Sequence, residues 1–294
     1  MSVGGSLPNE CSIKEGDLVI MYPWQGCAQC ELCTSGSSYL CEDEPGHDDG
    51  SIETLKSFML IRQWQNLVKL PREISAEIGC MLPSCCKIYA AILAAKPCFE
   101  QAVRLRGFAN LLILGRTANT GLQLWCIWLL KSVFCDKNVK VICANDSRDR
   151  LDEISKFGAD DAVFWSSDTS VDNVVDATTM SGYNKMDVAI DLVGGESSVA
   201  IAFKSLHNGG TILELGASGE EVKLSMADLV AKTITLKAIR AGSLSLFKQL
   251  VDLIAVQMMA LTFPIEFYNI EELNLAVDKF SRGQVQGYAI IKCE

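Results

Sequence analysis

The chain has 294 residues, of which 49% are hydrophobic and 21% charged, and its formal net charge is −10. This length is enough for about two domains, and the apolar content excludes a wholly disordered chain. An acidic surface repels phosphate groups, which argues against nucleic acid and anionic membranes as partners. We find no apolar run near the ~18 residues that span a bilayer and no hydrophobic N-terminal signal segment. A reducing, cytoplasmic location is therefore expected, where the 13 cysteines would bind metal or pack in the core.

Two patterns divide the chain. Up to about residue 88, strand-like segments at 17–21 and 66–70 flank a cysteine-rich, acidic loop at 26–50. From residue 110, short β-branched runs alternate with helical patterns, which is typical of βαβ units and a parallel sheet. We expect strands at 110–114, 140–145, 161–165, 186–191, 211–215 and 233–239, and helices at 120–134, 149–157, 171–180 and 197–206. Amphipathic helices at 244–259 and 271–281 and strands at 263–267 and 288–292 complete the chain.

Four cysteines in the N-terminal loop have the spacing of a metal site. Cys27, Cys30, Cys33 and Cys41 form a C-x2-C-x2-C-x7-C pattern. Zinc prefers four soft ligands in a tetrahedron, and closely spaced thiolates on one loop supply them with little chain strain. A closed four-thiolate site leaves no open coordination position, so the predicted zinc is structural and not catalytic.

A glycine-containing turn follows the first strand of the βαβ series. Its candidate cofactor-binding residues are Gly115, Thr117, Ala118, Asn119, Thr120 and Gly121. A dinucleotide turn needs glycine for a tight bend and for close approach to pyrophosphate, which then lies at the helix N-terminus. The G-x-G-x-x-G register does not fit, whereas G-x-x-G-x-x-G fits with Ala118 in the middle position. Placed between a strand and a buried helix, the motif predicts a dinucleotide site, although alone it is compatible with an ordinary strand-to-helix turn.

The order and spacing of these motifs resemble the zinc-containing alcohol dehydrogenases of the medium-chain dehydrogenase/reductase superfamily. The resemblance runs through the segments 16–19, 22–27, 66–71 and 81–83, the nucleotide-binding half, and the C-terminal segment 283–289. It implies an α/β fold with a Rossmann-type doubly wound parallel sheet over residues 89–243, which binds NAD or NADP. It also implies a partial GroES-like β domain over residues 1–88 that carries the four-cysteine zinc loop and is completed by residues 244–294.

The resemblance implies further cofactor contacts. Asn145 falls where the family usually carries an acidic residue for the ribose hydroxyls, and Arg150 matches a family lysine that contacts the ribose. Asparagine lacks the charge that would repel a 2′-phosphate, so NAD and NADP both stay open, and Arg150 is also compatible with a solvated helix face. The backbones of five turn residues would flank the nicotinamide, although as bare sequence they are plain turns: Leu192, Gly194, Leu215, Gly216 and Ala217.

The sequence assigns no catalytic residue. The family holds a catalytic zinc through an early Cys, a Gly-His-Glu segment and a third Cys, and the part expected to carry the first two is missing before Asp17. His47 is interpreted as a solvated loop residue, and His207 belongs to the Rossmann half. Cys85 or Cys86 lies near the third-ligand position, but a small buried cysteine is the favoured interpretation.

The leading hypothesis is an oxidoreductase that transfers hydride between NAD(P) and a small-molecule alcohol or carbonyl substrate. The alternative is a non-catalytic dinucleotide- and zinc-binding protein, or a truncated isoform without catalytic zinc ligands. A zinc-knuckle protein that binds nucleic acid is disfavoured by the acidic charge. The resemblance also implies a homo-oligomer, a dimer or tetramer, paired through the sheet edge near 233–242.

Overall fold

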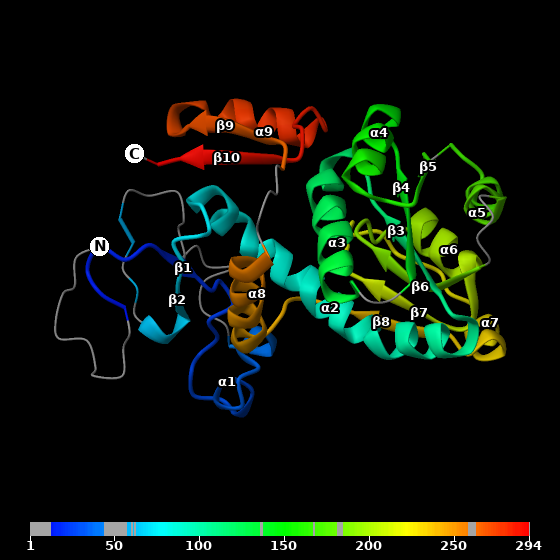
Figure 1. Ribbon diagram of the computed structural model, residues 1–294, viewed down its shortest axis with the longest axis horizontal. Coiled ribbons are helices and arrows are strands. Elements are labelled where there is room, and N and C mark those ends of the chain that lie inside the picture. The colour runs from blue at the N-terminus through cyan, green and yellow to red at the C-terminus, as the bar shows by residue number, and fades with distance from the viewer. Residues whose placement is uncertain are drawn as a thin grey trace.

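The computed structural model describes residues 13–43, 58–59, 61, 63–135, 138–166, 168–180, 185–257 and 263–293. Its largest element is a six-stranded sheet in which all neighbouring strands are parallel (Figure 1). In chain order the strands are β3 (Ala109–Leu114), β4 (Val139–Asn145), β5 (Asp161–Phe164), β6 (Met186–Asp191), β7 (Leu206–Glu214) and β8 (Thr235–Ala238). Their spatial order is β5-β4-β3-β6-β7-β8. This is the 3-2-1-4-5-6 order of the doubly wound dinucleotide fold, so the predicted fold class is confirmed.

The two faces of the sheet pack on different helices. The helices of this half are α3 (Thr120–Val133), α4 (Arg148–Phe157), α5 (Val171–Met180), α6 (Glu196–Ser205) and α7 (Met226–Lys232). Side chains point to alternate faces along β3. Leu111 and Ile113 therefore lie in the larger core with α3, and Leu112 and Leu114 lie in a second core with α5 and α6. All six residues of β3 are buried, because parallel strands between two helix layers have no solvent face.

A single long helix, α2 (Ala76–Arg106), was not expected from the sequence. Ser75 caps its start by accepting a hydrogen bond from the Ile78 N–H, and Gly107 ends it in a left-handed conformation with φ +81°. Contrary to our expectation, α2 is long and apolar enough to cross a bilayer, but 61% of its most apolar window is buried inside the protein. It packs against α3, α8, β6 and β7, so it is a core helix of this fold. The boundary expected between residues 88 and 89 falls inside it.

The N-terminal part is built around a small antiparallel sheet of β1 (Val19–Met21) and β2 (Leu67–Lys69). The loop between them carries α1 (Glu31–Thr34) and the 3-10 helices η1 (Ser38–Leu40) and η2 (Trp64–Asn66). Tyr22 follows β1, is fully buried, and donates its hydroxyl to the Gly242 carbonyl at 2.7 Å. This bond joins the N-terminal sheet to the segment that leaves β8.

The C-terminal part begins with α8 (Leu244–Gln257), which packs on α2. It continues as β9 (Ile265–Asn269), η4 (Ile270–Glu272), α9 (Leu273–Ser281) and β10 (Tyr288–Lys292). β9 and β10 pair in parallel, with Tyr288 opposite Ile265, so the chain's last two strands form a separate βαβ unit with α9 (Figure 1). This unit lies near the N-terminal sheet at one end of the molecule, while its loop before β10 reaches the six-stranded half.

Candidate zinc centre and dinucleotide site

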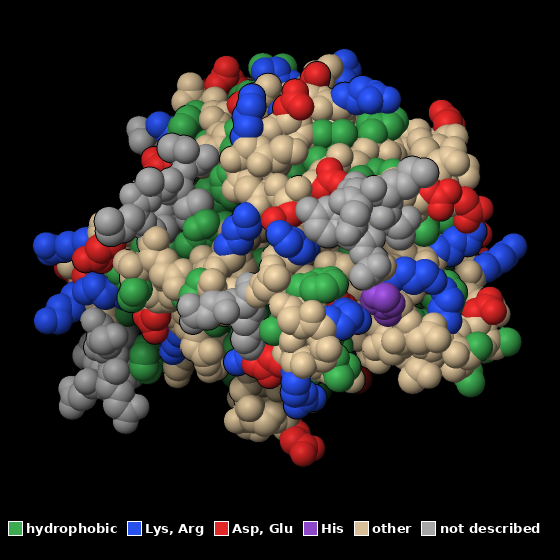
Figure 2. Space-filling model, turned by 45° about the vertical axis from the view of Figure 1, so that its right-hand side comes forward, with side chains coloured by type: hydrophobic (Ala, Val, Ile, Leu, Met, Phe, Trp, Pro, Cys, Tyr) green, Lys and Arg blue, Asp and Glu red, His purple; other side chains and the backbone are tan. Residues whose placement is uncertain are grey.

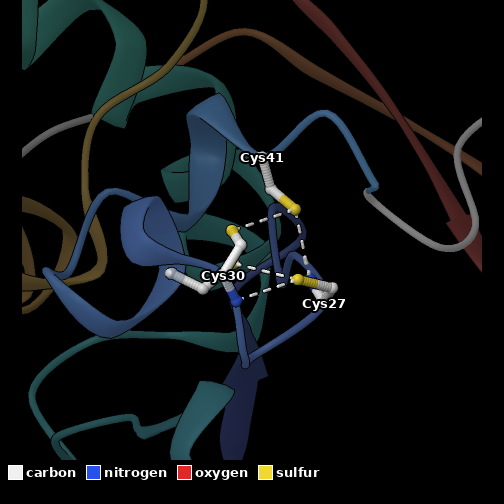
Figure 3. A group of neighbouring side chains, drawn as sticks. Cys27, Cys30 and Cys41 are labelled. Carbon is white, nitrogen blue, oxygen red and sulfur yellow. Dashed lines mark hydrogen bonds between the residues drawn. The ribbon is translucent and has the colours of Figure 1, made fainter.

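The four predicted zinc ligands lie together. The Sγ atoms of Cys27, Cys30, Cys33 and Cys41 are all within 4.8 Å of one another. The Sγ–Sγ distance is 3.9 Å from Cys27 to Cys33 and 3.8 Å from Cys30 to Cys41 (Figure 3 shows Cys27, Cys30 and Cys41). A tetrahedral zinc with Zn–S bonds of ~2.3 Å places its sulfur atoms about 3.8 Å apart. The cluster therefore has the composition and size of a closed structural zinc site.

The loop backbone is shaped for this cluster. Gly26 has φ +67°, and a Cβ added there would lie 2.5 Å from Cys33 Sγ, so only glycine fits beside the thiols. Ala28 also adopts a left-handed conformation, with φ +64°. Hydrogen bonds from the backbone N–H groups of Gln29 and Cys30 lower the pKa of Cys27 to about 6. Cys27 is therefore available as a thiolate, the form in which a cysteine could bind zinc.

A second metal site is not formed within the described ranges, where the cysteine cluster alone brings three or more His, Cys, Asp or Glu ligand atoms together. Cys85 and Cys86 are fully buried in α2, and burial raises the pKa of Cys86 to about 12. These are the surroundings of a packing cysteine, because a ligand must lose its proton. His207 lies near the start of β7, whereas the Gly115 turn follows the end of β3. His47 lies outside the described residues.

The Gly115 turn connects β3 to α3 through the 3-10 helix η3 (Thr117–Asn119). It lies at the carboxyl end of β3, next to β6, where the strand order reverses, and ligands of doubly wound sheets bind outside this point. Asp146 fixes the turn by accepting hydrogen bonds from both the N–H and the hydroxyl of Thr117, each at 2.7 Å. The Gly115 carbonyl accepts a bond from the Trp165 indole at 2.9 Å.

Asn145 lies beneath this turn and does not face the crevice. Its side chain is fully buried, its Nδ2 donates to Gln123 Oε1 at 2.6 Å, and its Oδ1 accepts from the Ser147 N–H at 2.9 Å. Gln123 in turn donates to the Ala144 carbonyl and leaves no room for a Cβ at Gly115. Asn145 thus supports the turn, and Asp146, which we considered only as its neighbour, is the residue that contacts it.

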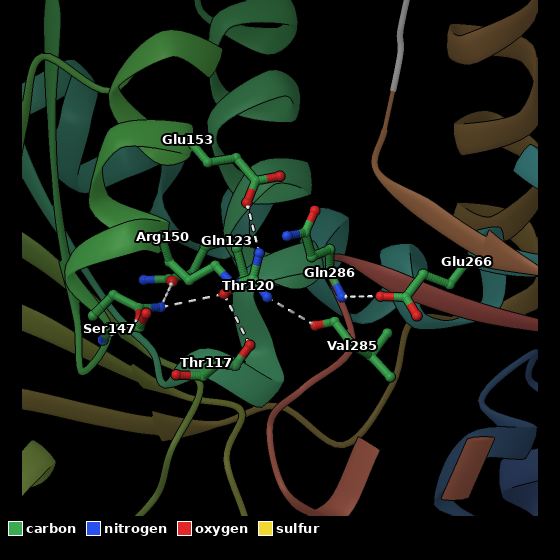
Figure 4. A network of polar contacts seen from close by, with 10 residues as sticks. Thr117, Thr120, Gln123, Ser147, Arg150, Glu153, Glu266, Val285 and Gln286 are labelled. Atoms are coloured by element: carbon green, nitrogen blue, oxygen red, sulfur yellow. Dashed lines mark hydrogen bonds and ion pairs between the residues drawn. The ribbon is translucent and has the colours of Figure 1, made fainter. Parts of the chain in front are cut away.

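The loop before β10 covers the start of α3 (Figure 4). A Cβ added at Gly121 would lie 2.5 Å from the Tyr288 ring and 2.9 Å from the Gly287 carbonyl oxygen. Arg150 is 8% exposed, and its guanidinium donates to the Val285 carbonyl at 3.3 Å while it pairs with Glu153 at 3.4 Å. The predicted cofactor residues Gly121 and Arg150 are therefore in contact with the C-terminal loop, a contact that spacing along the chain does not predict.

The turns after β6 and β7 meet at the same edge of the sheet. Leu192–Gly194 follows Asp191, and Leu215–Ala217 follows Glu214, its register partner. The turns touch so closely that a Cβ on Gly216 would lie 2.4 Å from the Gly194 nitrogen. All the predicted cofactor residues except Arg150 thus lie at the carboxyl ends of β3, β4, β6 and β7, and Arg150 lies in the helix after β4.

A cavity of about 420 Å³ opens between α3, α9 and β10. Its walls are mostly apolar, and the polar side chains among them are Ser84, Asn119 and Tyr288. Ala118 and Gly121 form the side nearest the dinucleotide turn. A small apolar molecule could therefore lie next to that turn.

Comparison with known proteins agrees with this architecture. A family model described as zinc-binding dehydrogenase matches residues 134–256. The D-arabinose 1-dehydrogenase (NADP(+)) of Saccharolobus solfataricus is 25% identical over 95% of this chain and 75% of its own length. For the NAD-dependent alcohol dehydrogenase of Sulfurisphaera tokodaii, the identity is 22% over 95% and 75% of the two chains. The solved alcohol dehydrogenase of Aeropyrum pernix has a TM-score of 0.72 at 23% identity, over 95% of this chain and 76% of the other.

The parallel sheet and its edge turns define a dinucleotide-type α/β protein. With the cysteine cluster and these matches, the chain is similar to the zinc-containing alcohol dehydrogenases of the medium-chain type. The matched relatives are named as NADP(+)- and NAD-dependent dehydrogenases, and the residues present fit a dinucleotide and a four-thiolate zinc. On the face in Figure 2, acidic and basic side chains are interspersed.

Proposed function

We propose that the chain is an NAD(P)-dependent oxidoreductase that acts on small alcohols or carbonyl compounds. One observation carries the proposal: the 3-2-1-4-5-6 sheet brings three glycine-containing turns together at its reversal point. When bound, the nicotinamide cofactor would accept or supply the hydride. The relatives described above are named as dehydrogenases of a sugar and of an alcohol, which supports this substrate class.

The proposed cofactor site divides among three groups of residues. The pyrophosphate would lie at the N-terminus of α3, on the backbone of Thr117–Gly121, where the helix dipole favours negative charge. The nicotinamide would lie against Leu192, Gly194, Leu215, Gly216 and Ala217. Asn145 would act through Gln123 and the turn, and Arg150 would hold the covering loop through Val285.

The alternative is a dinucleotide- and zinc-binding protein without catalysis. It is favoured by the absence of a second metal-ligating group from the described ranges and by the burial of Cys85 and Cys86. Metal analysis separates the two hypotheses, because one zinc per chain indicates structural zinc only and two indicate a catalytic metal as well. Turnover of simple alcohols or aldehydes would exclude the non-catalytic alternative.

Cofactor binding can be followed through Trp165, which touches the Gly115 carbonyl. We expect NADH or NADPH to change the tryptophan fluorescence with saturation, because both the indole and the turn would sense the bound dinucleotide. The matched control is Trp165→Phe, which should lose most of this signal while calorimetry still detects binding. No response to either dinucleotide by either method would contradict the proposed function.

We also propose a homodimer formed through the sheet edge. β8 pairs only with β7 among the described strands, and all four of its residues are exposed. Leu236 on β8 and Val230 on α7 leave apolar surface at this edge, 44% and 75% exposed, and an open apolar edge pairs readily with a second copy. Light scattering should give twice the chain mass for the wild type and the single mass for Leu236→Lys. A monomeric wild type would contradict the dimer.

The division into a dinucleotide domain (89–243) and a second part (1–88 with 244–294) is retained as a proposal, with α2 shared between them. A cytoplasmic location is proposed because the cysteines within the described ranges form no disulfide, as in a reducing compartment. Cell fractionation with a compartment marker tests it, and recovery in an oxidising secretory fraction would contradict it.

A further inference from the structure

Two carboxylic acids face each other at the carboxyl edge of the sheet. Asp191 ends β6, Glu214 ends β7, and the two are register partners on neighbouring parallel strands. Because side chains alternate along a strand, partners at the same register project from the same face of the sheet. Asp191 is fully buried and Glu214 is partly buried.

Each acid uses one oxygen to hold the turn that follows it. Asp191 Oδ1 accepts the N–H groups of Val193 at 2.8 Å and Gly194 at 3.2 Å. Glu214 Oε1 accepts the N–H of Gly216 at 2.9 Å. The turns are also joined directly, because the Asp191 carbonyl accepts the N–H groups of Leu215 and Gly216. The pair therefore lies at the centre of the contact between the two turns.

The other two oxygens have no donor. Asp191 Oδ2 and Glu214 Oε2 are both buried and make no hydrogen bond. The Ser198 hydroxyl lies within hydrogen-bonding reach of Asp191 and acts to lower its pKa, but the single hydroxyl proton is donated to the Gly195 carbonyl at 3.1 Å. Two buried, unsatisfied, like-charged acceptors are costly. A single proton between them removes both defects, since it supplies the missing donor and neutralises one of the two negative charges.

The charged groups around the pair are consistent with one proton shared by its two carboxyl groups. The titratable groups that act on Glu214 are Asp191 on β6 and Lys87 on α2, and Lys87 donates its Nζ to the Leu215 carbonyl. Ala238, the β8 register partner of Glu214, carries no charge. With one shared proton the two acids carry one negative charge, which the Lys87 ammonium balances. The buried cluster is then electrically neutral.

We propose that Asp191 and Glu214 share one proton and that this carboxyl pair is a positioning device that holds the turns Leu192–Gly194 and Leu215–Ala217 against each other. Its role toward the cofactor rests on the proposed function, because those turns would flank the nicotinamide. Loss of the proton leaves two adjacent buried carboxylates. The two turns already touch, because a Cβ added at Gly216 would lie 2.2 Å from the Val193 carbonyl carbon. Repulsion between the two carboxylates would therefore push the turns apart.

The titration range follows from the surroundings. Burial and the charge of Asp191 raise the pKa of Glu214 to about 8, and burial raises the pKa of Asp191 as well. An acid whose pKa is higher in the folded than in the unfolded protein stabilises the fold most at low pH. This contribution falls between its unfolded pKa of about 4.3 and its folded pKa, and it is lost above the latter.

The first test needs no cofactor. Infrared difference spectra of the full zinc-loaded chain between pH 6 and pH 10 should show loss of a protonated-carboxyl stretch, and this signal should be absent from Glu214→Gln. The amide of that variant can accept from Gly216 and donate to Asp191 Oδ2, so it mimics the protonated pair at every pH. Glu221→Gln, at an exposed position, is the matched control and should keep the signal. A wild type without the protonated-carboxyl signal would overturn the proposal.

The second test separates positioning from simple stability. Hydrogen exchange in the 192–194 and 215–217 segments should speed up above about pH 8 in the wild type, after correction for intrinsic rates, and stay slow in Glu214→Gln. NADH affinity should fall by up to about tenfold per pH unit above that pKa in the wild type and stay level in the variant. If neither protein binds NADH, the proposed function fails while the infrared and exchange results still decide the carboxyl pair. Equal pH dependence of exchange in both proteins would refute the positioning role.

Discussion

Asp146 accepts both the backbone N–H and the side-chain hydroxyl of Thr117, each at 2.7 Å, and so connects the end of β4 to the turn after β3. The residue before it, Asn145, supports the same turn from below through Gln123. Two consecutive residues thus hold one turn from two sides. The conformation of the proposed pyrophosphate site is fixed by the second strand of the sheet as well as by its own glycines.

We predict that Asp146→Ala weakens cofactor binding about tenfold and destabilises the fold by about 1–2 kcal/mol, because two bonds to a partly exposed carboxylate are lost. Asp146→Asn keeps one acceptor and should lose less of both. Urea unfolding and NADH titration measure the two effects. Asp152→Ala, at an exposed position on α4, is the control and should stay within about 0.5 kcal/mol of wild type. If the Asp146→Ala protein binds NADH as the wild type does, the turn keeps its conformation without the bonds to Asp146.

The zinc prediction concerns Cys33, whose Sγ lies 3.9 Å from that of Cys27. Cys33→Ser should reduce bound zinc from one per chain to less than half of that, because a three-thiolate site binds more weakly. The loop should then become sensitive to protease, which limited proteolysis measures. Cys135→Ser removes an exposed free thiol and should change neither result. Full zinc occupancy in Cys33→Ser would mean that the zinc binds at a site other than the cysteine cluster, which would contradict the prediction.

The fold was predictable where hydrophobic periodicity and turn residues agreed. The strand from Met186 to Asp191 and the helix from Val171 to Met180 are observed with the predicted limits. α2 was missed because Pro83 and Pro97 stand inside it, and an interior proline ordinarily ends a helix. Burial on several sides, against α3, α8 and the sheet, outweighs the loss of two backbone hydrogen bonds, and a local reading of the sequence does not contain that information.

The sites were predictable to different degrees for a physical reason. The zinc ligands lie within 15 residues of chain, so their spacing alone defines the cluster. The dinucleotide edge depends on contacts between distant segments, such as Tyr288 with Gly121 and Val285 with Arg150. The pairing of Asp191 with Glu214 depends on strand register. Such contacts become visible only when the strands are placed in order, which spacing along one chain does not provide.

Asp187 provides a prediction about stability. It is 8% exposed, forms an ion pair with Arg106 at 2.5 Å, and accepts the Asn110 N–H at 2.8 Å. Asp187→Ala should lower the free energy of unfolding by about 2–4 kcal/mol, because a charge and a backbone donor are left without their partner. The control is the exposed pair of Lys204 and Asp172. Asp172→Ala should cost no more than about 0.5 kcal/mol, and equal losses in the two variants would contradict the argument from burial.

The last prediction concerns the contact between α3 and the C-terminal strand. Gly121→Ala places a Cβ 2.5 Å from the Tyr288 ring, so the ring and β10 must move, at a cost of about 1–3 kcal/mol. In a Tyr288→Ala background this clash is gone. The same substitution should then cost much less, since alanine favours a helix over glycine by roughly 1 kcal/mol, although the Gly287 carbonyl 2.9 Å away still limits the gain.

A double-mutant cycle in urea measures this dependence, with an expected coupling energy of about 1 kcal/mol or more between the two positions. Gly79→Ala in α2 is the matched control, because its nearest neighbour is a flexible Leu70 methyl at 3.1 Å, and its effect should be independent of Tyr288. Additive effects of Gly121→Ala and Tyr288→Ala would mean that β10 does not rest on the start of α3 in solution. The cover over the proposed pyrophosphate site would then have to come from another part of the protein.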